Sequence, residues 1–162
     1  MPNRKRHKTW IVVADGARAR ILEQAAWRQP LELVEDLEDE AARRRPREIE
    51  SDDRGRVFDR GGPGRHAMET PTDPQRHEKE RFAKQLAGRL NQAAHGGRFD
   101  RLVLVAAAQM LGDLRRELDK GAADRVSHEL AKDLTAVSIH ELPRHLGDIV
   151  EVPDPRQVAA SR

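Results

Sequence analysis

The sequence has 162 residues, of which 36% are charged and 37% hydrophobic, and its formal net charge is +2. This length suits one domain with a single core, and the absence of cysteine excludes disulfides and thiolate metal sites. Two tryptophans and three phenylalanines are few for a base-stacking platform, and no segment approaches the ~20 apolar residues of a membrane helix.

The first eight residues form a basic segment that we expect to be a flexible tail. This tail carries Arg4, Lys5, Arg6 and Lys8 and no acidic residue. The apolar run that follows is short and is soon interrupted by charge, unlike a secretory signal peptide. Together with the lack of cysteine, this predicts a cytoplasmic protein that does not insert into a membrane.

Three short apolar segments follow, at residues 9–15, 19–24 and 31–37. The first, TWIVVAD, is a β-branched run typical of a central strand, and the other two have strand length and are bounded by Gly, Pro or charge. Asp15 and Gly16 give the Asp-Gly signature of a hairpin turn. The pattern predicts an antiparallel meander.

Residues 38–72 contain three prolines, four glycines and only four large apolar residues. Because so little apolar surface cannot offset the entropy cost of ordering, we expect a long mobile loop. Residues 54–65 hold four arginines and one acidic residue, so the basic surface is predicted here and in the tail. The candidate binding loop consists of Arg54, Arg56, Arg60, Gly61, Gly62, Pro63, Gly64, Arg65 and His66.

A long helix is predicted to follow, because an Asp-Pro pair at 73–74 gives an N-cap and a first-turn proline. A Gly-Gly pair at 96–97 ends it. An apolar stripe at helical spacing predicts its core-facing side: Phe82, Leu86, Leu90 and Ala93. On the charged side, Arg76 and Lys79 are the candidates for contacting a partner.

The remainder alternates between strand and helix patterns. A buried strand is predicted at 101–108, a helix at 109–118, a strand at 125–130 and a short helix at 138–146. Strands followed by alternating helices and strands indicate an α/β fold with a mixed central sheet flanked by helices. We expect a single domain over residues 9–150 and a flexible tail over 151–162.

Motifs for metal binding and catalysis are weak. Four residues invite a metal site: His66, Glu69, His77 and Glu78. No HExxH spacing joins them, so a solvated helix start is the favoured interpretation. Ser51, Ser127 and Ser138 lie outside any GxSxG motif, and Asp15 fits a turn better than a ligand site at a strand end. We therefore predict no catalytic residue, metal or cofactor.

The Gly-Gly-Pro-Gly stretch at 61–64 has two interpretations. Composition alone favours a flexible turn in a linker. The alternative is a loop presented to a ligand, whose glycines let the backbone approach closely while the flanking arginines bind phosphates. A phosphate-binding P-loop is not indicated, because no GxxxxGK[ST] context surrounds the stretch.

Four segments together carry a family resemblance: WIVVADGARARIL, GRHAMETPTDPQRHEKERFA, RLVLVAA and HELAKDLT. With them the sequence resembles the bacterial host attachment protein family over residues 10–148. That family is, more remotely, similar to the central domain of archaeo-eukaryotic translation release factors. The resemblance implies an RNase H-like α/β fold and a Gly-Gly-Gln type of loop, placed before a long basic helix, that faces the ribosome.

In that resemblance, Gly61 and Gly62 take the glycine positions and Pro63 takes the glutamine position. Pro63 has neither an amide side chain nor a backbone N–H with which to position a water, so we lean against an enzyme. We expect a non-catalytic binding protein that contacts the ribosome or structured RNA through the candidate loop and its arginines. The alternative is a factor required for attachment to host cells, with a protein or surface partner and no RNA role.

Overall fold

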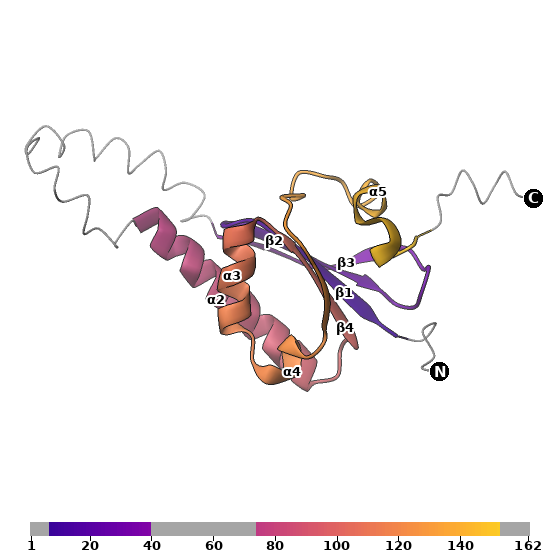
Figure 1. The fold of residues 1–162 in the computed structure, drawn as a ribbon, viewed down its shortest axis with the longest axis horizontal. Helices are drawn as coiled ribbons and strands as arrows, with labels where there is room; N and C mark the ends of the chain where they lie inside the picture. Colours follow the sequence, from indigo (N-terminus) through magenta and orange to yellow (C-terminus); the bar gives the residue numbers. More distant parts are fainter. Residues whose placement is uncertain (1–6, 40–73, 153–162) are drawn as a thin grey trace, which may run out of the picture.

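The computed structural model of the chain describes residues 7–39 and 74–152. A five-stranded sheet forms its centre, with helices on both faces (Figure 1). The strands are β1 (Thr9–Ala14), β2 (Arg18–Gln24), β3 (Leu31–Glu38), β4 (Arg101–Ala106) and β5 (Val126–Leu130). The helices are α2 (Pro74–His95), α3 (Ala108–Glu117), α4 (Lys120–Ala123) and α5 (Leu142–Leu146), followed by the 3₁₀ turn η3 (Gly147–Ile149). The predicted α/β fold with a mixed sheet flanked by helices is confirmed.

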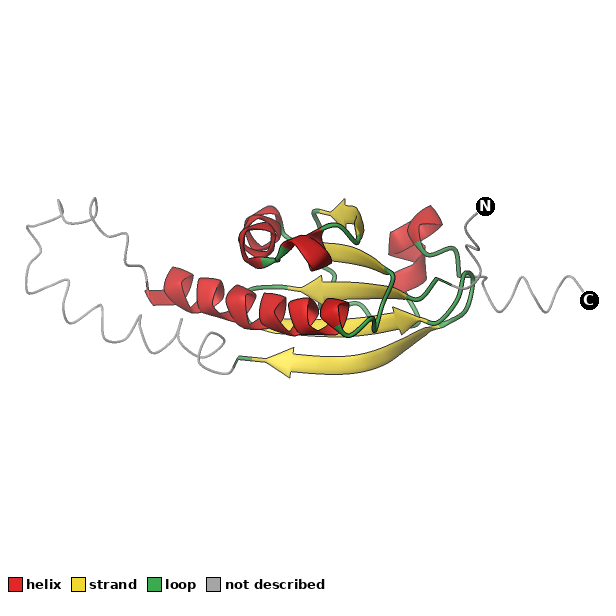
Figure 2. Cartoon of the chain, turned by 90° about the horizontal axis from the view of Figure 1, so that it is seen from below, coloured by secondary structure: helices red, strands yellow, loops and turns green. Residues whose placement is uncertain are grey.

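The strand order is β3-β2-β1-β4-β5. Strands β1, β2 and β3 form the predicted antiparallel meander, and β4 and β5 run parallel to β1. Parallel pairing of β1 with β4 requires a crossover, in which α2 lies along the sheet (Figure 2). The carboxyl ends of β1, β4 and β5 therefore lie at the same end of the sheet.

The central strand β1 is buried along its whole length. Trp10 and Val12 face the cluster under α2, α3 and α4, whereas Ile11 and Val13 face the cluster under α5. A strand covered on both faces needs apolar side chains at successive positions rather than at alternate ones. This explains the uninterrupted apolar run that marks the strand in the sequence.

Helix α2 packs its predicted stripe onto the sheet. Phe82, Leu86 and Leu90 are each no more than 1% exposed, which confirms them as core residues. Glu78, which the sequence predicts in a solvated helix start, is buried instead, and its Oε1 lies 4.0 Å from Nη1 of Arg81. Proximity to this arginine accommodates one carboxylate at the margin of the core.

The last helix differs most from its predicted bounds. The sequence pattern extends it over 138–146, but α5 begins at Leu142, because the chain first makes a turn at Ser138 and Pro143 occupies the first helical turn. The four-residue helix α4 has no apolar period to predict it. It forms because the side chain of Asp119 caps its N-terminus.

The predicted tails, 1–8 and 151–162, and the predicted loop, 38–72, lie outside the described residues except at their edges. At the first edge, the carbonyl of Lys8 accepts a hydrogen bond from the N–H of Asp100 at 2.8 Å. Among the described residues, none of the helices has the length and apolar character to cross a membrane.

Candidate nucleic-acid interface

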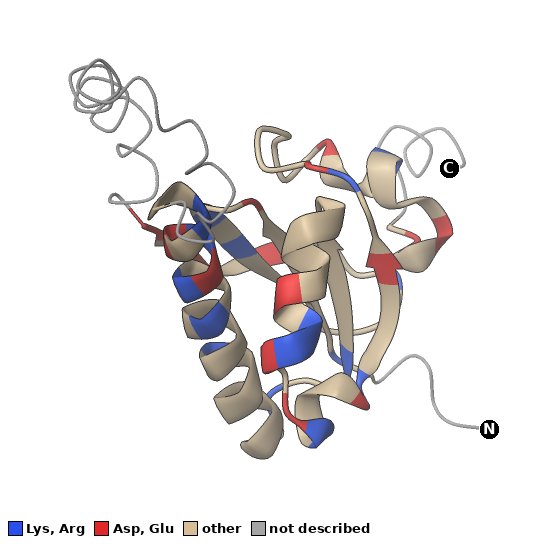
Figure 3. Ribbon diagram, turned by 60° about the vertical axis from the view of Figure 1, so that its left-hand side comes forward, with Lys and Arg blue, Asp and Glu red and all other residues tan. Residues whose placement is uncertain are grey.

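The side of α2 that points away from the sheet carries basic and neutral polar residues, and we call it the outer face. It consists of His77, Arg81, Lys84, Gln85, Gly88 and Gln92, all exposed. They lie together because their positions in the 22-residue helix are opposite the buried stripe. Figure 3 shows the Lys and Arg positions along α2. Two carboxylates border these cations: Oε1 of Glu78 lies 4.0 Å from Nη1 of Arg81, and Glu80 is exposed and pairs with Arg76. The exposed cations of this face favour an anionic partner.

Gly88 lies in the middle of the outer face. A Cβ added to Gly88 would meet nothing within 4 Å. Glycine inside a helix costs roughly 0.5 to 1 kcal/mol relative to alanine, and the fold gives no reason for it here. Its effect is to leave helix backbone bare at the centre of a basic surface, where a partner can approach closely.

The two helix residues predicted to contact a partner are only partly exposed. The guanidinium of Arg76 donates to Oδ1 of Asp113 on α3 at 2.5 Å, and its Nε lies 3.4 Å from Glu80. The stem of Lys79 packs over Gly16 in the β1–β2 turn, where an added Cβ would lie 2.6 Å from its Cγ. The charge of Arg76 is thus compensated within the chain. Arg81 and Lys84 are more exposed, although Arg81 lies 4.0 Å from the carboxylate of Glu78.

Of the predicted basic tail, the structure describes Lys8 alone, whose Nζ lies 3.7 Å from Oε1 of Glu23. The rest of the tail and the candidate binding loop lie outside the described residues: Arg4, Lys5, Arg6, Arg54, Arg56, Arg60, Gly61, Gly62, Pro63, Gly64, Arg65 and His66. Their part in binding stays a prediction.

The C-terminus of α2 positions a further arginine. Gly97 adopts a φ of 69°, and its N–H donates to the carbonyl of Ala94 at 3.0 Å. The N–H of Arg98 donates to the carbonyl of Ala93 at 2.9 Å, which completes a Schellman motif. This fixed helix end places the guanidinium carbon of Arg98 5.1 Å from the centre of the Trp10 ring.

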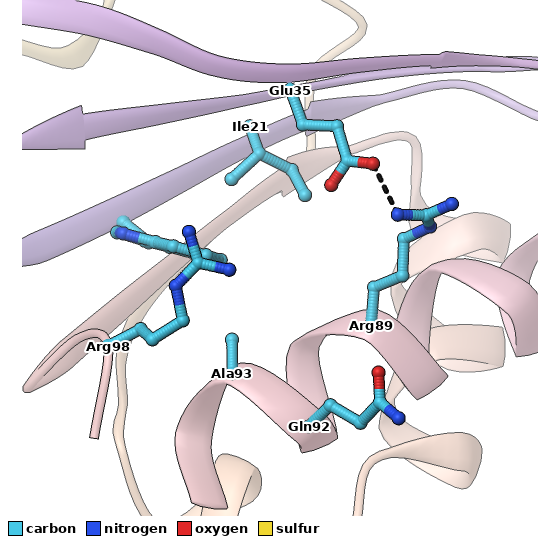
Figure 4. A pocket seen from close by; sticks show the side chains of 7 residues that line it. Ile21, Glu35, Arg89, Gln92, Ala93 and Arg98 are labelled. Carbon is cyan, nitrogen blue, oxygen red and sulfur yellow. Dashed lines mark hydrogen bonds and ion pairs between the residues drawn. The ribbon is translucent and has the colours of Figure 1, made fainter. Parts of the chain in front are cut away.

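Beside Arg98 lies a cavity of about 130 Å³, between the C-terminal half of α2 and strands β2 and β3. Ile21, Ala93 and Trp10 border it but are 0%, 5% and 3% exposed, so its accessible surface is mostly polar. The paired side chains of Glu35 and Arg89 form one side. Figure 4 shows Arg98 and Arg89 on opposite sides of the space, with Ile21 and Ala93 above and below. Gln92 of the outer face also lines the cavity, so the two features are contiguous.

A buried carboxylate joins α2 to α3. Asp113 is 3% exposed, and its Oδ1 accepts hydrogen bonds from Arg76 on α2 and from Arg116 on α3. Two guanidinium groups on one carboxylate balance its charge and leave no nucleophile or general base exposed. We assign Asp113 a role in holding the two helices together.

Asp15, at the carboxyl end of β1, has a structural role. Oδ1 of Asp15 accepts from the N–H groups of Ala17 and Arg18 at 2.8 and 2.7 Å, and its Oδ2 accepts from Thr135 Oγ1 at 3.2 Å. This confirms the turn interpretation of Asp15. Within 7–39 and 74–152, no group of three or more His, Cys, Asp or Glu residues could hold a metal ion.

On the opposite face of the sheet, Arg20 of β2 is 7% exposed. Its Nη2 donates to the carbonyls of Leu134 and Val137, at 3.0 and 2.6 Å. Burial lowers the pKa of this guanidinium, and the neighbouring charge of Arg18 lowers it further. Arg20 thereby ties the segment after β5 to the sheet.

Sequence patterns did not indicate the cavity. Glu35 and Arg89 are far apart in the chain, and neither belongs to a motif. The one local signal was the Gly-Gly helix end, which fixes where Arg98 leaves α2. The outer face could be anticipated, since it is the complement of the apolar stripe.

A family model described as "Protein required for attachment to host cells" matches residues 10–146. The chain belongs to this family. The resemblance seen in the sequence is therefore confirmed at the family level. No curated protein matches the chain.

Solved structures share the fold. One, described as "Crystal structure of archaeal translation termination factor, aRF1", has a TM-score of 0.54 and 12% sequence identity. Another, described as "Archaeal protein", has a TM-score of 0.48 and 11% identity. Each match covers 95% of this chain and 38% of the other. At such identities the likeness concerns the fold alone, and this chain spans well under half the length of either structure.

Proposed function

We propose that this member of the host attachment family is a non-catalytic, cytoplasmic protein that contacts the ribosome or structured RNA. The observation that carries the proposal is the outer face of α2, which presents Arg81 and Lys84 beside bare backbone at Gly88. Arginine and lysine on such a surface bind phosphates without reading sequence. The arginines of the candidate loop, residues 54–65, would extend this contact.

The fold likeness to the archaeal translation termination factor aRF1 supports the proposal, because that protein acts in translation. The described sheet, an antiparallel meander followed by two parallel strands, is compatible with the RNase H-like fold that the resemblance implies. We place the contact on α2 because it is the helix that follows the candidate loop in the chain. Pro63 at the glutamine position favours binding without hydrolysis.

The test is a salt series of association with bacterial ribosomes and with a structured RNA. Each lost phosphate contact lowers the slope of log affinity against log salt by about 0.7 to 0.9. The double variant Arg81→Ala, Lys84→Ala should therefore lower the magnitude of the slope by about 1.4 to 1.8.

The matched control removes two exposed cations from the far side of the molecule. Lys132→Ala with Arg144→Ala makes the same charge change, at the segment after β5 and on α5. This control should leave the slope unchanged. Equal effects of the two double variants would show only a response to net charge and would refute a contact at the outer face.

The family description supports a second hypothesis, an attachment factor with a protein or surface partner and no RNA role. Cell fractionation followed by ribosome sedimentation separates the two. Co-sedimentation that salt disrupts supports the RNA contact, and an indirect effect on attachment then follows from a role in translation. A wild-type chain that binds neither ribosomes nor RNA at low ionic strength favours the second hypothesis.

A further inference from the structure

Strand β3 forms one edge of the sheet. Among the described residues it pairs only with β2, because the strand order begins β3-β2-β1. Alternate residues of an edge strand turn their N–H and C=O groups outward, where a further strand can pair with them. In the described part of the chain, Leu31–Glu38 therefore presents an open row of backbone donors and acceptors.

An apolar side chain lies on this edge. Leu33 is 48% exposed, and within 7–39 and 74–152 it is the one large hydrophobic residue that is exposed. Its partner across the ladder is Leu22, which is buried in the cluster under α5, so Leu33 lies on that face of the sheet. An apolar residue of an added strand, placed opposite Leu33, would cover it from the side that Leu22 leaves open.

The charge of β3 selects the kind of strand that can pair with it. The strand carries four carboxylates and no cation: Glu32, Glu35, Asp36 and Glu38. Two of them pair with arginines of α2 and β2, whereas Glu32 is exposed and has no such partner among the described residues. Like charges opposite one another destabilise a strand pair, so the β3 of a second copy is disfavoured. A strand with arginine and lysine at the facing positions is favoured instead.

We propose that β3 binds an extended segment of another protein, rich in arginine and lysine, which adds to the five-stranded sheet as a sixth strand. Basic side chains of the segment face the carboxylates of β3, and an apolar side chain covers Leu33. The ladder is interrupted at Val34, the extra residue of a bulge against β2. In strand addition, main-chain hydrogen bonds give affinity and alternate side chains give specificity. The inference does not depend on the RNA contact, because it concerns a different element and a partner of opposite charge.

The first experiment uses a synthetic peptide of alternating arginine and valine, with capped ends and a length equal to the eight residues of β3. Its binding to the full chain is followed by fluorescence anisotropy of an attached dye. A second peptide carries proline in place of one central valine, which keeps the charge but removes a ladder donor and disfavours a strand. The first peptide should bind saturably and about tenfold more tightly than the second. Equal binding of the two, or no saturable binding, would overturn strand addition.

Variants of the chain then test the charge match. Glu32→Lys should weaken binding of the arginine-valine peptide by about fivefold to tenfold, because an attraction across the strands becomes a repulsion. Glu117→Lys is the matched control, since it makes the same charge change at an exposed position at the end of α3. The control should bind the peptide as the wild-type chain does. Equal effects of the two variants, whether both weaken binding or neither does, contradict a contact at β3.

The second experiment locates the contact by amide hydrogen exchange of the full chain. Saturating arginine-valine peptide should slow exchange of the outward-facing amides over 31–38 and leave 126–130, in the other edge strand β5, unchanged. Protection that appears elsewhere and not over 31–38 would overturn the proposal. Slow exchange of every amide over 31–38 without the peptide would show that another segment of this chain or a second copy already covers the edge, and would also overturn it.

Discussion

Replacing Gly88 by alanine should stabilise the domain while weakening its binding to RNA. The added Cβ meets nothing within 4 Å, so the substitution carries no steric cost. Alanine is favoured over glycine in a helix interior by about 1 kcal/mol. For a chain of this size, that gain raises the melting temperature by about 2 to 4 °C.

Urea unfolding followed by far-UV circular dichroism measures the change. With a slope of about 1 to 3 kcal/mol per molar urea, the midpoint should rise by roughly 0.3 to 1 M. Gly112→Ala in α3 is the control, because an added Cβ there also meets nothing within 4 Å. Both variants should be stabilised to a similar degree, since both remove a helix-interior glycine.

The two variants should differ in RNA binding. If phosphates approach the bare backbone at Gly88, its alanine variant binds RNA more weakly than wild type, whereas Gly112→Ala binds equally well. Unchanged or lowered stability of Gly88→Ala would refute the structural argument. Raised stability with unchanged RNA affinity would refute the assignment of Gly88 to the interface.

Further substitutions test the core and the buried charges. Leu86→Ala should lower the free energy of unfolding by about 2 to 5 kcal/mol in urea titration, since Leu86 is 0% exposed, and a change within error would show that α2 is not packed there. Arg20→Ala should speed amide hydrogen exchange over 131–141, because two carbonyls there lose their hydrogen-bond donor. Unchanged exchange would show that Arg20 does not hold this segment against the sheet. The hydrogen bond that the Ala122 N–H donates to Asp119 lowers the pKa of this carboxyl group. The stabilisation that the ionised Asp119 gives the fold is therefore present above the carboxyl pKa of the unfolded chain, and it is lost as the pH falls through the lower pKa of the folded chain. Asp119→Asn should therefore make the free energy of unfolding less dependent on pH at acid pH. An unaltered pH dependence would count against this linkage.

Local patterns predicted most of the fold. The β-branched run of β1, the stripe containing Leu86 and the glycine pair that ends α2 are each short-range signals, and the structure confirms them. Such signals work because hydrophobic period and turn chemistry act within a few residues. The predicted mixed sheet followed from their order along the chain.

The candidate site was less accessible to sequence patterns, because its contacts join distant segments. Arg76 has the spacing of an exposed residue at the start of a helix, yet Asp113, 37 positions later in the chain, draws its side chain against α3. Glu35 and Arg89 meet only because β3 is at the sheet edge beside α2. Partners of this kind depend on how helices settle on the sheet, and no local spacing encodes them.

The shared carboxylate of Asp113 has a mechanical consequence for α2. Sliding α2 along α3 by one helical turn, about 5.4 Å, would pull Arg76 away from a carboxylate that is 3% exposed. Arg116 would still pair with Asp113, so the cost is that of one lost hydrogen bond between charged groups, about 1.5 to 3 kcal/mol, which is an appreciable share of the stability of a small domain. This cost opposes sliding of α2 along α3. When a partner presses on the outer face, we therefore expect α2 and α3 to move together as one rigid unit against the sheet.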